Sequence, residues 1–79
     1  ALVFIALLVG SERDVTQRAS TLDGVKEIYS VTGDVDLIVS VEVPGMEELN
    51  KVIHELRSLD GVQGTDTHIV LSRTRGKGA

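Results

Sequence analysis

The side chains best suited to chemistry lie at a predicted hairpin turn, Gly33-Asp34-Val35-Asp36. Gly33 can adopt the positive φ of a tight turn, and Asp34 tolerates such turns while bonding its own backbone. The turn leaves backbone N–H groups free beside the carboxylates of Asp34 and Asp36 at one rim of a sheet. A small polar ligand could bind there, although acidic turns often serve only to reverse the chain and keep it soluble.

Two threonines, Thr65 and Thr67, form a second candidate set at the start of a predicted strand. Residues i and i+2 of a strand share one face, so both hydroxyls can donate or accept hydrogen bonds on the same side. With other polar groups they could hold an ammonium or a carboxylate in a cleft shared with a neighbouring subunit. The alternative is that threonine is simply common in strands.

No residue set in the sequence favours catalysis, a metal or a cofactor. There is no cysteine, and His54 and His68 lack the spacing of metal ligands. No serine or threonine has a base at a recognisable spacing, and the glycines are scattered at turns instead of forming a phosphate loop. Asp34 and Asp36 could be an acid/base pair, but alternate strand residues point to opposite faces. We therefore predict a protein that is not an enzyme and has no cofactor.

Hydrophobic periodicity predicts the elements that position these residues. An apolar run at residues 2–9 is typical of a buried strand, and it is too short to cross a bilayer, so we expect no membrane contact. A short amphipathic helix follows, ending at Asp23-Gly24, and a second one, with a clear apolar stripe, ends at Asp60-Gly61. Further strands are expected at residues 25–32, at residues 35–43 and from residue 63 or 65 to residue 73. In the first of these, Val25, Tyr29 and Val31 are expected on one face and Ile28 on the other.

The tetrapeptide Leu-Asp-Gly-Val occurs twice, at residues 22–25 and 59–62, each time closing a helix and opening a strand. The order is therefore βαβ followed by βαβ, an α+β arrangement known as the ferredoxin-like βαββαβ fold. Right-handed crossovers place both helices on one face of a four-stranded antiparallel sheet. The first and third strands are central in this fold, and here they are the most apolar.

Short length and an exposed apolar face together predict self-association. A domain of 79 residues without cysteine buries only roughly 60% of its unfolded surface, so its own core is marginal. We expect apolar side chains on the sheet face that the helices leave open, namely Phe4 or Ile5 with Leu7, Ile28, Ile38 and Val70. An exposed apolar face of this kind favours a partner. We predict a homodimer packed sheet to sheet, a dimeric α/β barrel.

Composition sets further limits on the partners. The net charge of −4 argues against a general nucleic-acid surface, which would be basic. Arg73, Arg75 and Lys77 are a local exception, and we expect residues 73–79 to form a flexible tail of a single domain spanning residues 1–79. The sequence shows neither a basic segment before the apolar run nor a cleavage site after it, so we expect a cytoplasmic location.

The hairpin sequence Val31–Val39, the Leu59-Asp60-Gly61-Val62 turn and the segment Thr65–Leu71 resemble the ligand-binding domain of the leucine-responsive regulator/AsnC (Lrp/AsnC) family. The resemblance covers residues 2–73, nearly the whole chain. It implies a module for transcription regulation that forms sheet-to-sheet dimers, assembles them into rings that are often octameric, and binds an amino-acid effector between dimers. On this resemblance, the cleft would be lined by Gly33, Asp34, Asp36, Thr65, Thr67 and Tyr29.

The sequence departs from the family's transcription regulators because no helix-turn-helix segment precedes the first strand. It therefore resembles a stand-alone module, or a fragment of a longer regulator, that does not bind DNA directly and could assemble with a full-length relative. Two alternatives remain open: a small dimeric α/β-barrel enzyme of monooxygenase type, and a purely structural oligomerisation module. The scarcity of aromatic residues counts against the enzyme. An ACT-type amino-acid domain would share the topology but would pair edge to edge.

Overall fold

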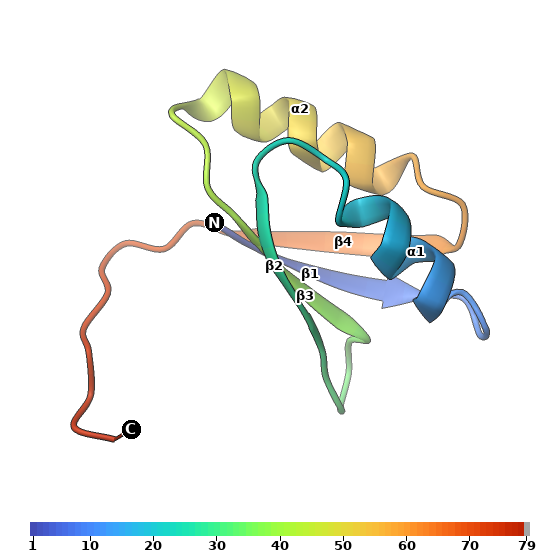
Figure 1. The fold of residues 1–79 in the computed structure, drawn as a ribbon, viewed down its shortest axis with the longest axis horizontal. Helices are drawn as coiled ribbons and strands as arrows, with labels where there is room; N and C mark the ends of the chain where they lie inside the picture. The colour runs from blue at the N-terminus through green and yellow to red at the C-terminus, as the bar shows by residue number, and fades with distance from the viewer. Residues whose placement is uncertain (79) are drawn as a thin grey trace.

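The computed structural model describes residues 1–78 and contains a single four-stranded sheet with two helices (Figure 1). The elements in chain order are β1 (Leu2–Leu7), α1 (Glu12–Ala19), β2 (Val25–Ser30), β3 (Leu37–Val41), α2 (Met46–Arg57) and β4 (Val62–His68). The strands lie in the order β2-β3-β1-β4, and every neighbouring pair is antiparallel. The predicted ferredoxin-like βαββαβ fold, with β1 and β3 at the centre, is confirmed.

The core lies between the sheet and the two helices, which cover the same face (Figure 1). Alternate residues of the central strands point into it, and the apolar stripes of the helices meet them. Among residues 1–78 ten are buried, all of them hydrophobic: Val3, Ile5, Val15, Ala19, Leu37, Val39, Val41, Leu49, Val52 and Leu56. The predicted amphipathic helices are therefore confirmed, and α2 contributes three of the ten residues.

All four strands end earlier or begin later than predicted, and for the first and last strands the ends follow from where the pairing between β1 and β4 stops. The first strand was expected to reach residue 9, but β1 ends at Leu7, its last pair with β4. Beyond it, the C=O of Leu8 accepts the N–H of Ser11 at 3.1 Å in a turn. The last strand was expected to reach residue 73, but β4 ends at His68, which pairs with Leu2 at the start of β1. Residues 69–78 therefore have no strand beside them and adopt no regular structure.

The side chains of β2 do not alternate between faces as predicted, because the strand contains a β-bulge. The register shifts between Val25 and Glu27, so that Val25 and Ile28 both pair with core residues of β3 and lie on the helix side. Tyr29 pairs with Ile38 on the opposite face. The prediction that Val25 and Tyr29 share a face was wrong, because a bulge changes the alternation of side chains without leaving a period in the sequence.

The face of the sheet away from the helices, here called the open face, is less apolar than predicted. Of the two alternatives Phe4 and Ile5, it is Ile5 that is fully buried on the helix side. Leu7 and Ile28 pack against the same core, so these two expectations were wrong. Phe4 and Ile38 do lie on the open face, together with Leu2, as strand alternation requires. Val70 follows the end of β4 and is about half exposed. Within residues 1–78 no helix has the length and apolar character needed to span a membrane.

Candidate functional site

The predicted hairpin connects β2 to β3 through residues 31–36, one end of which is closed by a hydrogen bond from the Val31 N–H to the Asp36 C=O at 3.1 Å. Gly33 has φ +110°, the left-handed conformation expected from its place in the turn. Asp34 is exposed at the tip. The loop is longer than the predicted tight turn, since β3 begins at Leu37 and not at residue 35.

Asp36 anchors this hairpin to the end of the neighbouring strand β1. Its backbone N–H donates to the Ile5 C=O at 2.9 Å, and its carboxylate Oδ2 accepts the N–H of Leu7 at 2.7 Å. A charged acceptor makes the second bond stronger than a neutral one. One carboxylate oxygen of Asp36 is thus engaged in holding the loop, which leaves the other for a ligand.

The two predicted threonines lie on the helix side of the edge strand β4, paired with Ile5 and Val3. Both are half-buried, so the expectation that Thr65 and Thr67 share a face is confirmed. Thr65 also lines a polar hollow of about 440 Å³ at the end of α2, together with Arg57 and Gln63. A hydroxyl beside a guanidinium group offers hydrogen-bond donors to an anionic group such as a carboxylate.

The structure does not bring the six predicted ligand-binding residues together in one protomer. The hairpin and the start of β4 lie at the same end of the sheet, because Leu37 and Thr65 both pair with Ile5. However, β1 separates β3 from β4, a distance of two strand spacings or about 10 Å. Tyr29 lies on the far edge strand and on the open face. A site containing all six residues therefore requires more than one copy of the chain.

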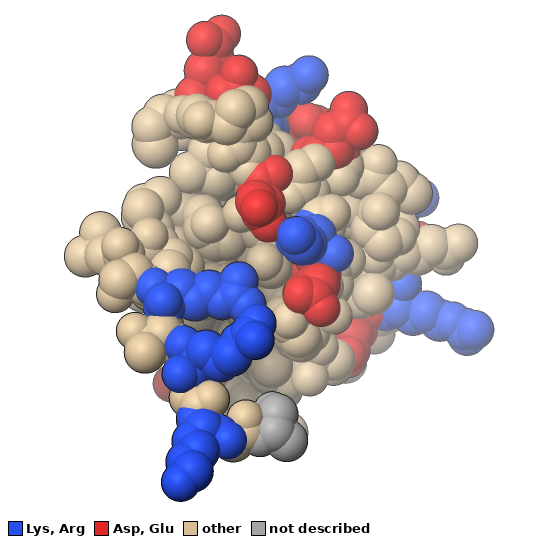
Figure 2. Space-filling view, turned by 60° about the vertical axis from the view of Figure 1, so that its left-hand side comes forward, with Lys and Arg blue, Asp and Glu red and all other residues tan. Residues whose placement is uncertain are grey.

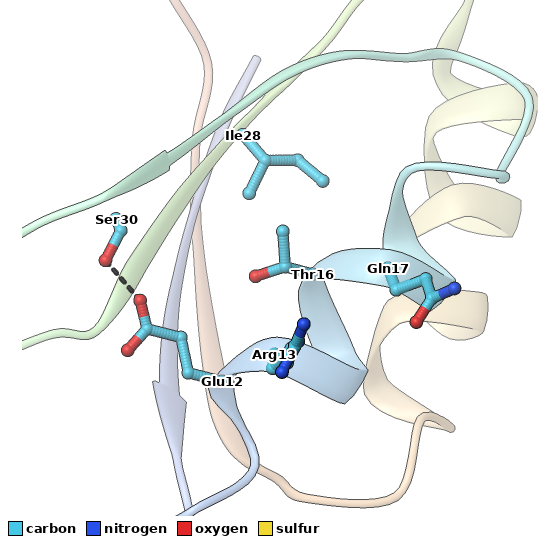
Figure 3. A pocket seen from close by; sticks show the side chains of 6 residues that line it. All are labelled: Glu12, Arg13, Thr16, Gln17, Ile28 and Ser30. Atoms are coloured by element: carbon cyan, nitrogen blue, oxygen red, sulfur yellow. Dashed lines mark hydrogen bonds between the residues drawn. The ribbon is translucent and has the colours of Figure 1, made fainter.

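A groove that the sequence did not reveal lies between α1 and β2 (Figure 3). It has a volume of about 680 Å³, and Ile28 faces Thr16 across it. Glu12 reaches from the helix to β2, where its carboxylate accepts a hydrogen bond from the Ser30 hydroxyl. Arg13 and Gln17 complete the rim. No sequence motif marks this groove, because it arises from how α1 packs against the edge of the sheet.

Glu27 is the neighbour that most affects the Tyr29 hydroxyl. The Glu27 carboxylate accepts a hydrogen bond from the Tyr29 hydroxyl, and this bond, reinforced by the negative charge of Glu27, raises the pKa of Tyr29. Nearby, the ammonium of Lys26 lies 3.0 Å from Glu42 and lowers the pKa of that carboxyl. Tyr29 lines a hollow of about 660 Å³ at the edge of the open face, which Val70 and Arg73 also line.

The histidines do not form a metal site with their neighbours. His68 Nε2 lies 3.0 Å from Asp66 Oδ2, and its ring centroid is 4.8 Å from that of Phe4. Among residues 1–78 no three His, Cys, Asp or Glu side chains are grouped so as to hold a metal ion. His68 is thus a partner of Asp66 on the open face.

The structure is a ferredoxin-like sheet with polar groups and open hollows at its rims, and this fold alone is compatible with many functions. Residues 1–78 match the family model described as the Lrp/AsnC ligand binding domain. The chain belongs to this family, and the resemblance noted in its sequence is confirmed.

Solved structures with the same fold agree with this assignment. TTHA0845 from Thermus thermophilus is 30% identical with a TM-score of 0.87, and the match covers 95% of each chain. The hypothetical protein PHS023 from Pyrococcus horikoshii is 30% identical with a TM-score of 0.81, covering 99% of this chain and 95% of the other. MtbAldR, at 22% identity and a TM-score of 0.77, shares the fold over 95% of this chain and 53% of its own.

The curated relatives are much longer proteins, and the chain matches only a small part of each. Homocitrate synthase from Sulfurisphaera tokodaii is 42% identical over 59 residues, which make up 75% of this chain and 13% of the synthase. Homocitrate synthase from Saccharolobus solfataricus is 41% identical over the same shares. The chain thus corresponds to about an eighth of these enzymes. The family match and this limited overlap identify a domain of the Lrp/AsnC ligand-binding type.

Proposed function

We propose that this chain binds an amino-acid effector at a site completed by a second copy, and that binding favours one assembly over another. The observation that supports this most is the match to a ligand-binding domain over residues 1–78, whose candidate residues are divided between the two sides of β1. A ligand that bridges subunits stabilises their assembly in proportion to its occupancy, because the separated subunits bind it less well.

The candidate residues offer the two kinds of partner that an amino acid needs. The carboxylate of Asp34 and the free oxygen of Asp36 suit the ammonium, and the Thr65 and Thr67 hydroxyls suit the carboxylate. The loop of one protomer and β4 of another would supply them to the same ligand. Homodimers joined through their open faces would form a ring, an octamer in our proposal, with Gly33 close to the ligand backbone and Tyr29 at the cleft margin. We expect the assembly to act in the cytoplasm in transcription regulation, alone or with a full-length relative, without touching DNA itself.

Calorimetric titration with each of the twenty amino acids, followed by native mass spectrometry, tests this proposal. Asp34→Ala and Thr67→Ala should each weaken binding about tenfold or more, the loss expected for one charged or polar contact, with the dimer intact. Asp23→Ala is the matched control, since Asp23 is also exposed but lies beyond α1, at the opposite end of the sheet. Equal affinity in the wild type and both variants would remove these residues from the site. Assembly without any amino-acid binding would favour the structural module instead.

A second candidate function follows from the homocitrate synthase relatives, in which a similar domain forms a small part of an enzyme. The module would then report an effector to a catalytic domain and not to a DNA-binding partner. Reading the coding sequence on both sides of residues 1–79 distinguishes the two. A synthase reading frame continuous with this one would favour the enzyme-linked role, and a helix-turn-helix segment or separate stop codons would oppose it.

A further inference from the structure

Charge is unevenly distributed along the chain. Residues 1–68 contain all twelve acidic residues and five of the eight basic ones, which leaves a net charge of −7. The residues after β4 contain Arg73, Arg75 and Lys77 and no acidic side chain. Figure 2 shows one group of basic side chains at the lower left, while the other basic side chains are dispersed over the view. The segment 69–77, here called the arm, is thus a cationic extension of an acidic domain.

The arm also contains apolar residues without a place in the protomer core. Ile69, Val70 and Leu71 are 53%, 49% and 95% exposed. They continue the alternating strand pattern of β4, but the pairing between β4 and β1 stops at His68 and Leu2. Three consecutive exposed apolar residues at the end of a strand are a common site of pairing with another chain.

The open face has acidic side chains at its rim, which the positive charge of the arm could balance. Its apolar centre, which includes Phe4 and Ile38, is flanked by Glu27 on β2 and Asp66 on β4, because these residues alternate onto that side. A two-fold dimer joined through this face brings two such acidic sets together, and buried like charges are strongly unfavourable without cations.

The strands themselves supply little positive charge to balance this face. Lys26, at the bulge of β2, is already paired with Glu42 at 3.0 Å, and His68 is the other basic side chain that the strands of residues 1–78 place near it. The arm begins at the edge of the same face, where Val70 and Arg73 line one hollow with Tyr29. Its cations are therefore the ones within reach of the acidic rim.

We propose that the arm of each protomer lies on the open face of a second copy of the chain. Ile69, Val70 and Leu71 extend the apolar contact, while Arg73, Arg75 and Lys77 offset the acidic side chains on the rim. This inference rests on the proposed sheet-to-sheet dimer and adds the element that makes it electrostatically favourable.

Sedimentation velocity across a range of concentrations and salt tests the arm. In the variant R73Q/R75Q/K77Q the dimer dissociation constant should rise about tenfold at low salt, and its dependence on salt should weaken. The control R13Q/R18Q/K51Q changes three exposed basic residues on the helices and produces the same net charge of −7 for the whole chain. It should change the constant by less than about twofold. A second variant, E27Q/D66N, should also reduce the salt dependence, from the acidic side of the contact.

The outcomes separate this inference from the proposed function. If the wild type forms no dimer at any concentration, the proposed assembly fails and the arm's role with it. If the wild type dimerises but both triple variants raise the dimer dissociation constant equally, the total charge of the chain controls association and the arm does not. An unchanged dimer in R73Q/R75Q/K77Q, with loss of binding to a short DNA duplex instead, would assign the arm to nucleic acid and overturn the proposal.

Discussion

At the scale of single residues, Asp36 has a structural role in addition to its proposed role in ligand binding. Its carboxylate accepts a hydrogen bond from the N–H of Leu7, and in our proposal the same carboxylate binds the ammonium group of the effector. Asp36→Ala should lower the free energy of unfolding by about 1 kcal/mol, the value of one hydrogen bond to a charged acceptor at an exposed position. Urea denaturation measures this loss. Asp34→Ala is the control and should leave stability unchanged, since Asp34 makes no side-chain hydrogen bond among residues 1–78.

The two roles of Asp36 can be separated because asparagine keeps a hydrogen-bond acceptor and loses the charge. Asp36→Asn should therefore restore most of the stability lost in the alanine variant while still binding the effector weakly. If the asparagine variant binds as tightly as the wild type, the Asp36 carboxylate is not the ammonium partner. If Asp36→Ala is as stable as the wild type, the 2.7 Å bond to Leu7 does not form in solution.

The sequence could predict part of this hairpin and not the rest. The positive φ of Gly33 follows from the residue types of a turn, which is local information. The bond between Asp36 and Leu7 joins residues 29 positions apart. It depends on where β1 ends beside β3, and no local pattern contains that register.

At the scale of elements, the repeated Leu-Asp-Gly-Val turns fix how each helix passes into the following strand. Gly24 and Gly61 both have positive φ, at +91° and +97°. At Gly61 an added Cβ would lie 2.5 Å from the Ser11 side chain, so the turn after α2 packs directly against the start of α1. Because the contact involves the base of the side chain, rotation of Ser11 cannot relieve it.

Gly61→Ala should therefore cost about 2–4 kcal/mol of unfolding free energy, combining the left-handed backbone penalty with a steric overlap. Gly33→Ala is the matched control, since Gly33 shares the positive φ but nothing lies within 4 Å of its added Cβ. It should cost only about 1–2 kcal/mol. Thermal and urea unfolding of both variants give the difference, and equal losses would show that Ser11 moves away without penalty.

The elements themselves were predictable, while their ends and one of their faces were not. Apolar periodicity identifies α2 and the central strands because local repeats set which side chains are buried. The end of β4 at His68 depends on where its neighbour begins, and the bulge after Val25 depends on the pairing with β3. Both features depend on the pairing of strands in the sheet, so they cannot be predicted from the sequence of one strand alone.

At the scale of the whole molecule, the fold is contained in one chain and the proposed site is not. The βαββαβ order follows from two repeated units, and right-handed connections then fix the topology. The candidate residues on the hairpin and on β4 remain apart in the protomer, separated by β1. In the proposed site these residues come together from different copies of the chain, and a single sequence does not specify how the copies pack against each other.

The dimer that this site requires can be tested by placing one charge on the open face. Ile38 lies at its centre, so Ile38→Asp should raise the dimer dissociation constant more than about 100-fold, because burying an unpaired carboxylate costs several kcal/mol. Its circular dichroism spectrum should stay that of the wild type, since Ile38 is not among the core residues. Met46→Asp, on the exposed N-terminus of α2, is the control and should remain dimeric. Effector binding should fall together with dimerisation in Ile38→Asp, because a cleft between subunits exists only in the assembled state. A variant that dimerises normally would place the interface elsewhere, and a monomer that still binds the amino acid would place the whole site within one protomer.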